Sequence, residues 1–490
     1  MARVERVLSS MRRRWAVLAT AVAAAIGAAL MLSREDGLPP ADELAVIDPD
    51  AEDPFAYDDD RRADFERRAA RGSSHVLYAK SPGGVVATAR RTARYRRQVE
   101  VAAPTGGVEP DMLEAIVFLE SAGREDAVAD SKLEGAVGLT QILAETGRNL
   151  LAMRVDTAAA RRLSRRIRRA ERRGDTPAAD RLRARRRTVD ERFDPVRSLQ
   201  ATGRYLAFAR ERLAREDFAI TAYHMGVGNL QQAIADFGRE GSAPRSYAEL
   251  YFASSPISHT AAYRRLAALG DDSSTYLWRV LAAREIMRVF REDPAALERL
   301  ADLQTAKNSS EEVLHPEDDT ESFSDPEALE EAYDDGQVRA FPNSPRRLGL
   351  RRDPRMGELA RRLEREPRLY WGLRPEAYAL AAYLAEMVRS VGRTPAPLVI
   401  TSTVRDRRYQ RLLVRRNQEA TSSYSLHTTG YAFDVRRSYR SRDHARAFQF
   451  ALDRLRALNL IAWVREPGAI HITVSADARR LQPLLRPAGG

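Results

Sequence analysis

The segment SLHTTGYAFDV, residues 425–435, places His427 and Asp434 on either side of Gly430. Imidazole and carboxylate groups are both good zinc ligands. The chain has only seven histidines and no cysteine, so any metal would have to be held by histidine, aspartate or glutamate. The alternative is that the pair simply marks a strand end with polar residues.

A second candidate for chemistry is Glu120, near the end of VEPDMLEAIVFLESAG, residues 108–123. Proline near the start and glycine at the end of this segment predict a helix. Met112, Ile116 and Leu119 would share its buried face, which Glu120 borders. An apolar border favours the protonated carboxyl that a general acid needs. The alternative is a glutamate at a fraying helix end.

Length and composition limit the kind of protein that surrounds these residues. A chain of 490 residues predicts about two to four domains, and 44% hydrophobic residues exclude global disorder. The formal net charge of +11 comes mainly from arginine and suggests polyanionic partners. An arginine-favouring, high-GC genome is an equally good explanation of this charge.

The N-terminus predicts a location outside the bacterial inner membrane. Residues 1–14 form a basic tail, and residues 15–32 are uncharged and apolar over a length near the lower limit for a spanning helix. This segment is either a transmembrane anchor or a cleaved signal helix. Both place the remainder of the chain on the periplasmic side, where nucleic acid is not an expected partner.

Shifts in composition divide the remainder into four segments. Residues 33–84 are predicted to be an acidic spacer, and residues 85–303 have helical patterns. Residues 304–345 are again acidic and turn-rich, as in a linker or lid. Residues 346–490 mix helices and strands, and no repeat of fixed period is present.

Four motifs follow one another in the helical region. They are Glu120-Ser121, GAVGLTQ at 135–141, DP followed by GRYL within 194–206, and AYHMG at 222–226. Their order and spacing resemble the lysozyme-like soluble lytic transglycosylases of bacterial cell walls, over roughly residues 95–290. The resemblance implies an all-α domain that cuts the glycan strands of peptidoglycan.

The resemblance also implies a mechanism with one carboxyl group, where ordinary glycosidases use two. Glu120 would protonate the glycosidic oxygen and then accept the proton of the substrate's 6-hydroxyl, which closes a 1,6-anhydro ring. The residues expected to bind substrate are Ser121, Gln141, Tyr223 and Tyr276. The chain departs from the family in having His224 where asparagine is usual.

A second departure is an arginine-rich insertion at residues 154–193, between the second and third motifs. It is predicted to form two helices broken at residues 174–177. One interpretation is a solvated helical hairpin. The other is an electrostatic docking site for an anionic wall or membrane polymer.

The C-terminal region is predicted to be a small α+β fold with an antiparallel sheet. A strand running into a helix is expected at 397–413, a turn and strand at 422–437, a helix at 442–458 and a hairpin at 460–476. His444 is expected on the surface of the helix. The order S-x-H-x-x-G-x-A-x-D, with R-x-x-x-Y-Q before it and H-x-T-V after it, resembles zinc D-alanyl-D-alanine peptidases and their carboxypeptidase-like relatives.

This second resemblance implies a zinc site. The ligands carried over are His427, Asp434 and His471, with Ser425 as a supporting hydrogen-bond partner. Arg405 would hold the peptide's carboxylate or carbonyl, and Glu466 would be the base that activates water. The family usually has the acid three residues before the last histidine, where this chain has Gly468.

Together these features predict a two-domain cell-wall enzyme that is anchored in the inner membrane or secreted. One domain would cut glycan strands, and a zinc-dependent domain would cut stem-peptide bonds as a carboxypeptidase or endopeptidase. The alternative is a peptidoglycan-binding scaffold in which one or both sites are inactive.

Overall fold

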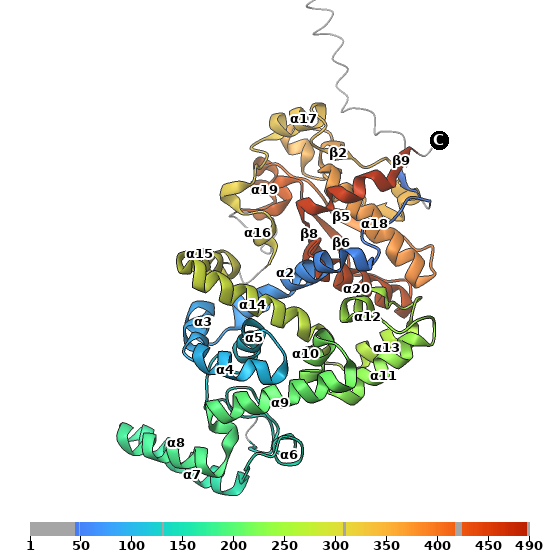
Figure 1. The fold of residues 1–490 in the computed structure, drawn as a ribbon. Helices are drawn as coiled ribbons and strands as arrows, with labels where there is room; N and C mark the ends of the chain where they lie inside the picture. The colour runs from blue at the N-terminus through green and yellow to red at the C-terminus, as the bar shows by residue number, and fades with distance from the viewer. Residues whose placement is uncertain (1–44, 49, 130–131, 307–309, 417–423, 488–490) are drawn as a thin grey trace, which may run out of the picture.

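The computed structural model describes residues 45–48, 50–129, 132–306, 310–416 and 424–487. Helices predominate, and an all-helical part lies below a part that contains a sheet (Figure 1). Within the described ranges, no helix is both long and apolar enough to cross a membrane. The segment 15–32, predicted to be an anchor or signal helix, lies outside these ranges.

The region 85–303 folds into helices joined by short turns, as predicted. Its α-helices are α3 (Val85–Ala93), α4 (Arg96–Gly106), α5 (Pro110–Ser121), α6 (Ala144–Asn149), α7 (Thr157–Arg172), α8 (Thr176–Val189), α9 (Pro195–Leu213), α10 (Glu216–Met225), α11 (Val227–Gly238), α12 (Tyr247–Ala253), α13 (Thr260–Ala268), α14 (Tyr276–Glu292) and α15 (Pro294–Thr305). Two 3₁₀ helices are η2 (Glu191–Phe193) and η3 (Asp272–Thr275). Residues 112–118 of α5 are all buried, so this helix forms the centre of the core.

The C-terminal region contains a five-stranded sheet in the order β3-β5-β6-β8-β7. Its strands are β3 (Leu350–Arg352), β5 (Leu398–Ser402), β6 (Ala432–Arg436), β7 (Ile461–Arg465) and β8 (Ala469–Val474). All neighbours are antiparallel except β3 and β5, which are parallel. The sheet, predicted to be antiparallel, is therefore mixed, because the long connection that contains helix α18 (Pro375–Gly392) makes β5 run in the same direction as β3.

The remaining helices of this region flank the sheet. They are α19 (Arg407–Val414), α20 (Arg442–Ala457), η5 (Pro345–Leu348), η6 (Ala360–Leu363), η7 (Pro367–Tyr370), η8 (Leu426–Thr429) and η9 (Ala476–Leu484). The surface position predicted for His444 is wrong, since this residue of α20 is only 2% exposed. The end of α18 lies against the first turns of α20, where Gly392 approaches Ala447.

Part of the predicted spacer 33–84 is a packed helix. After the 3₁₀ helix η1 (Asp59–Arg61), residues 62–80 form α2 (Arg62–Lys80), which packs against both α14 and α20. Phe65 and Leu77 are buried in this contact. The acidic composition of the preceding residues concealed the apolar face that makes α2 part of the core.

The predicted linker 304–345 is also packed. It contains α16 (Glu311–Leu314), η4 (Glu317–Asp319), α17 (Pro326–Asp334) and β2 (Arg339–Ala340), which pairs with β4 (Gly372–Leu373). Phe323 is 3% exposed, and its backbone N–H donates to the Thr428 carbonyl at 2.8 Å. Residues 310–324, called the strap below, therefore lie against the C-terminal domain.

The two domains are joined by direct contacts. The Arg454 guanidinium donates to the carbonyls of Phe252 and Ser254, each at 2.6 Å. The chain before α2 also reaches the C-terminal domain, where β1 (Ala45–Ile47) pairs with β9 (Leu485–Pro487). The largest hydrophobic cluster contains buried residues of both domains, and smaller clusters lie beside it.

Candidate active sites

Glu120 and Tyr276 form the centre of the first candidate site. Glu120 lies in the last turn of α5, and its carboxyl accepts a hydrogen bond of 2.7 Å from the Tyr276 hydroxyl at the start of α14. Burial raises the pKa of Glu120 to about 7, against the Tyr276 hydrogen bond and the Arg279 charge, which lower it. Near-neutral pKa values suit a group that must both give and take a proton.

Tyr276 is 1% exposed and is held in place by α10. The rings of Tyr223 and His224 stack on it at centroid distances of 6.5 and 5.1 Å. The Tyr223 hydroxyl donates to the Thr140 carbonyl at 2.6 Å, and His224 Nδ1 lies 2.8 Å from Ser273 Oγ. His224, the departure from the family pattern, thus braces the tyrosine that contacts Glu120.

Gly138 and the buried Arg192 determine the conformation of the GAVGLTQ loop. Gly138 has a φ of +82°, and a Cβ there would lie 1.9 Å from the Arg192 carbonyl oxygen. Arg192 is fully buried in an ion pair with Asp190. Its guanidinium holds the loop by donating to the carbonyls of Leu133, Gly135 and Ile142.

The other two predicted substrate-binding residues differ in their positions. Gln141 follows Thr140 in this loop, and its side-chain amide donates to the Gly138 carbonyl at 2.8 Å. Ser121 is 2% exposed, and its hydroxyl donates to the Val117 carbonyl within α5. The structure therefore turns Ser121 into the core, away from any substrate.

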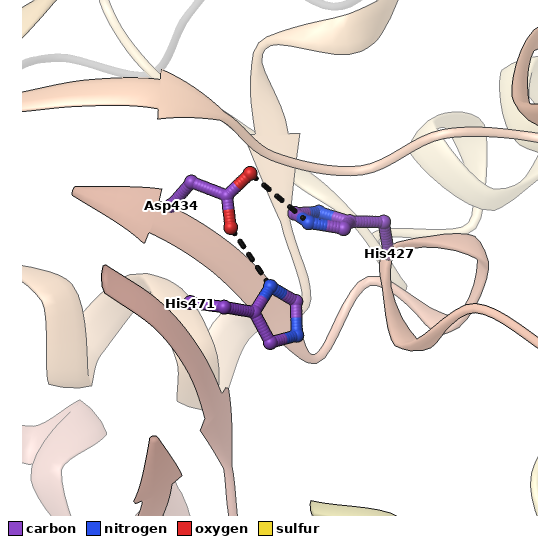
Figure 2. A group of neighbouring side chains, drawn as sticks. All are labelled: His427, Asp434 and His471. Atoms are coloured by element: carbon purple, nitrogen blue, oxygen red, sulfur yellow. Dashed lines mark hydrogen bonds and ion pairs between the residues drawn. The ribbon is translucent and has the colours of Figure 1, made fainter. Parts of the chain in front are cut away.

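The second candidate site is a group of three side chains, His427, Asp434 and His471 (Figure 2). One possible ligand atom from each lies within 4.8 Å of the others. His427 Nε2 is 3.3 Å from one carboxylate oxygen of Asp434, and His471 Nδ1 is 2.8 Å from the other. The structure thus brings the three predicted ligands together.

The sheet register and a tight turn position these side chains. Asp434 on β6 is paired with His471 on β8, and directly opposite residues present their side chains on the same face. His427 lies in η8, which ends at Gly430 with a φ of +79°. The Ser425 carbonyl accepts the backbone N–H of Thr428 and so closes this turn. The hydroxyl bond predicted for Ser425 stays a prediction.

Polar neighbours orient both imidazoles. The carbonyl of Thr403 lies 2.8 Å from His427 Nδ1, which leaves Nε2 for Asp434. A carboxylate oxygen of Glu311, on the strap, lies 3.5 Å from His471 Nε2, which leaves Nδ1 for Asp434. Such outer contacts fix the tautomers of metal-binding histidines. Two imidazoles and one carboxylate with these contacts fit zinc and leave room for a fourth ligand.

The protonation states of this group determine how it would accept a cation. Burial and the charge of Arg405 lower the pKa of His427 to about 4. Burial opposes charge on His471, but the Asp434 hydrogen bond and nearby acidic groups raise its pKa to about 9. Although burial also opposes the ionised form of Asp434, the two imidazoles hold its pKa well below the usual range. An ionised carboxylate with imidazole neighbours is the donor set that binds a metal, with release of a proton from His471.

Arg405 and Glu466 lie around the same group. Arg405 lines a cavity of about 290 Å³ together with Asp434, and its guanidinium is 3.7 Å from the Asp434 carboxylate. It also donates to Ser402 Oγ at 2.6 Å. Burial and the nearby charge of Asp434 raise the pKa of Glu466, which is partly buried beside the β7–β8 turn. The structure thus places Glu466 within electrostatic reach of Asp434.

Sequence reasoning missed Glu311, Thr403 and Arg192. Glu311 lies in the predicted linker, and only the fold shows that it reaches His471. Thr403 acts through its backbone carbonyl, which carries no residue-type signal. Arg192 was one of many arginines in the insertion, and only its pairing with the nearby Asp190 could have distinguished it.

Comparison with known proteins adds one finding. Residues 175–244 match the family model described as Transglycosylase SLT domain. The match spans α8 to α11 and includes Tyr223 and His224, while Glu120 precedes it. A search of curated proteins found no match. The similarity of residues 175–244 to this domain supports lytic transglycosylase activity on peptidoglycan in the cell envelope.

Proposed function

We propose that this protein is a bifunctional peptidoglycan-remodelling enzyme on the periplasmic side of the bacterial inner membrane. The hydrogen bond between Glu120 and Tyr276, in a domain with an SLT match, is the observation that carries the first activity. The group of His427, Asp434 and His471 supports the second, zinc-dependent cleavage of stem-peptide bonds. The apolar segment 15–32 would anchor the protein in the membrane or direct its secretion.

In the glycan reaction, Glu120 would act first as acid and then as base. Its carboxyl proton moves to the glycosidic oxygen as the bond between N-acetylmuramic acid and N-acetylglucosamine breaks. The resulting carboxylate takes the proton of the muramic 6-hydroxyl, whose oxygen bonds to the anomeric carbon. The products are a 1,6-anhydro sugar and a free hydroxyl, and no water is consumed. The Tyr276 hydroxyl stabilises the carboxylate between the two steps.

In the peptide reaction, His427 Nε2, Asp434 and His471 Nδ1 would hold the zinc ion. The ion would supply a Lewis acid and lower the pKa of a bound water. Arg405, in its cavity beside Asp434, would bind the carboxylate or carbonyl of the peptide. Glu466 would take the proton of the attacking water and pass it to the leaving amine.

Mass analysis of products from purified sacculi tests both activities in the full-length protein. The wild type should release muropeptides that end in 1,6-anhydro-N-acetylmuramic acid, each one water lighter than a hydrolytic product. Glu120→Gln should release almost none of them but should still cut stem peptides. His427→Ala should lose zinc and peptide cleavage but keep the anhydro products.

Three outcomes would contradict this proposal. Reducing-end glycan products from the wild type would indicate hydrolysis, with a second carboxylate in the first site. Stoichiometric zinc in His427→Ala would remove His427 from the metal site. Tight binding to sacculi without products of either kind would favour the alternative of a scaffold with inactive sites.

A further inference from the structure

The hairpin of α7 and α8 carries an arginine surface that neither candidate site uses. Leu163 and Ile167 are buried on the inner face of α7, so its outer face is open to solvent. Within the described ranges, the side chains of several exposed arginines of this hairpin form neither an ion pair nor a hydrogen bond. They are Arg162, Arg165, Arg166, Arg168, Arg169, Arg172, Arg173, Arg181 and Arg185.

The acidic residues of the hairpin do not neutralise this surface. Glu171 and Asp180 both pair with Arg183, on the inner side. Asp175 caps α8 by accepting the backbone N–H of Ala178 at 3.0 Å. The outer face therefore keeps a positive charge along α7, whose 16 residues span about 24 Å.

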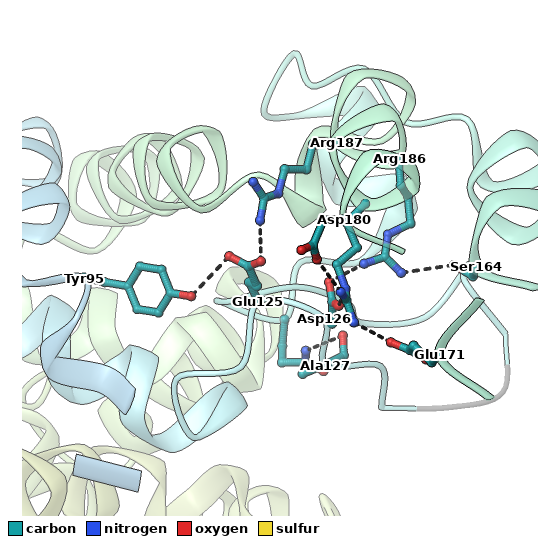
Figure 3. A network of polar contacts seen from close by, with 11 residues as sticks. Tyr95, Glu125, Asp126, Ala127, Ser164, Glu171, Asp180, Arg186 and Arg187 are labelled. Carbon is teal, nitrogen blue, oxygen red and sulfur yellow. Dashed lines mark hydrogen bonds and ion pairs between the residues drawn. The ribbon is translucent and has the colours of Figure 1, made fainter. Parts of the chain in front are cut away.

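The hairpin is fixed to the loop that follows the Glu120 helix (Figure 3). Arg186 pairs with Asp126, and Arg187 pairs with Glu125. Glu125 and Asp126 come a few residues after Glu120 at the end of α5. Beyond the hairpin, the chain continues to the buried arginine that holds the GAVGLTQ loop. The hairpin that carries the arginine surface is thus fixed by ion pairs to the loop that follows Glu120.

We propose that this arginine surface binds the carboxylates of peptidoglycan stem peptides and holds the strand that Glu120 cuts. This inference rests on the proposed function of the first site. Every strand brings stem-peptide carboxylates with it, and the mount on the Glu120 loop keeps the arginines at a fixed place relative to the cut. Guanidinium groups pair with carboxylates through two parallel hydrogen bonds, so a row of them suits a repeating carboxylate polymer.

The position of the hairpin favours peptidoglycan over membrane lipid as the ligand of the arginine surface. The first described strand, β1, pairs with β9, and β9 lies at the opposite end of the molecule from α7 and α8 (Figure 1). A membrane segment that precedes β1 would therefore leave the arginine surface facing away from the bilayer. Binding to anionic lipid is kept as an outcome of the test.

The test measures binding of full-length Glu120→Gln protein to purified sacculi, so that it does not depend on turnover. Arg162, Arg165 and Arg169 are replaced together by glutamine. The matched control replaces Arg264, Arg361 and Arg411, which are exposed and have no ion pair among the described residues. Both triple variants lose the same charge. At low salt, the hairpin variant should bind roughly tenfold more weakly or worse, and the control should change less than about twofold.

Two further measurements identify the ligand. The difference between the variants should disappear in 1 M salt, where charges are screened beyond about 3 Å. It should also disappear with glycan strands freed of stem peptides by an amidase. Equal binding of both variants to intact sacculi would overturn the inference, as would a loss confined to anionic phospholipid vesicles. If the hairpin variant binds weakly but the active protein yields no anhydro products, the proposed function fails and the docking surface stands.

Discussion

Removing the Tyr276 hydroxyl should make Glu120 a weaker acid. In the Tyr276→Phe protein the 2.7 Å hydrogen bond to the carboxylate is lost, while burial of Glu120 is kept. A hydrogen bond to a charged group contributes about 1.5–3 kcal/mol, and one pKa unit corresponds to about 1.4 kcal/mol. Because Glu120 is only partly buried and water can replace the hydroxyl, the lower end applies. The pKa of Glu120 should therefore rise from about 7 by roughly one unit.

The assay is the rate of anhydro-muropeptide release across pH 5 to about 10. The reaction needs a protonated Glu120, so activity falls on the alkaline side as this carboxyl ionises. That alkaline limb should move upward by about one unit in Tyr276→Phe. Tyr205→Phe is the control, because the Tyr205 hydroxyl donates to the Ala222 carbonyl and not to Glu120. A limb that stays in place or moves to lower pH would refute the reasoning, and NMR titration of the carboxyl would decide the matter if turnover is too slow.

Three other predictions follow from the two sites. The pKa of Glu120 in the folded protein lies above the usual 4.5, so the wild type loses stability as pH rises to about 7. At pH 8, Glu120→Gln should therefore be more stable to unfolding than the wild type, by at most about 3 kcal/mol. Thermal unfolding at pH 5 and pH 8 checks this, and a variant effect independent of pH would contradict it. Glu311→Ala should weaken zinc binding about 10- to 100-fold in chelator competition. Glu317→Ala, on the exposed part of the strap, should leave zinc affinity unchanged. Equal zinc affinities of the two variants would exclude a role for Glu311. Glu466→Gln should keep zinc but lose about two to four orders of magnitude in peptide cleavage, and full turnover would show that another group is the base.

The parts that could be predicted from sequence depend on local geometry. The position of Glu120 beside an apolar face follows from the spacing of Met112 and Ile116, and both are buried as expected. The approach of His427 to Asp434 needs only a tight turn with glycine at positive φ, which Gly430 supplies. These features are set by residues close together in the chain, so a motif can report them.

The predictions that were wrong or missing concern contacts between segments that are distant in the chain. The acidic residues that precede α2 led to its assignment as a spacer, because Phe65 and Leu77 become core residues only where α14 and α20 pack against them. The same composition concealed Glu311, whose contact with His471 spans most of the C-terminal domain. His444 lies on a helix as predicted, but the face that is buried depends on where α18 ends. Patterns along the chain cannot show which segments return to one another.

The pairing of β1 with β9 has a consequence for how the chain folds. Strand residues 45–47 have no partner until residues 485–487 have been made, and α2 has no contact with α20 until nearly as late. Contacts between such distant positions form slowly, because the loop between them must first be closed. During that interval the apolar face of α2 stays open to aggregation or to chaperones. A late defect in the C-terminal domain would thus also affect the helical domain, because α2, which packs on α14, would lack its contact with α20.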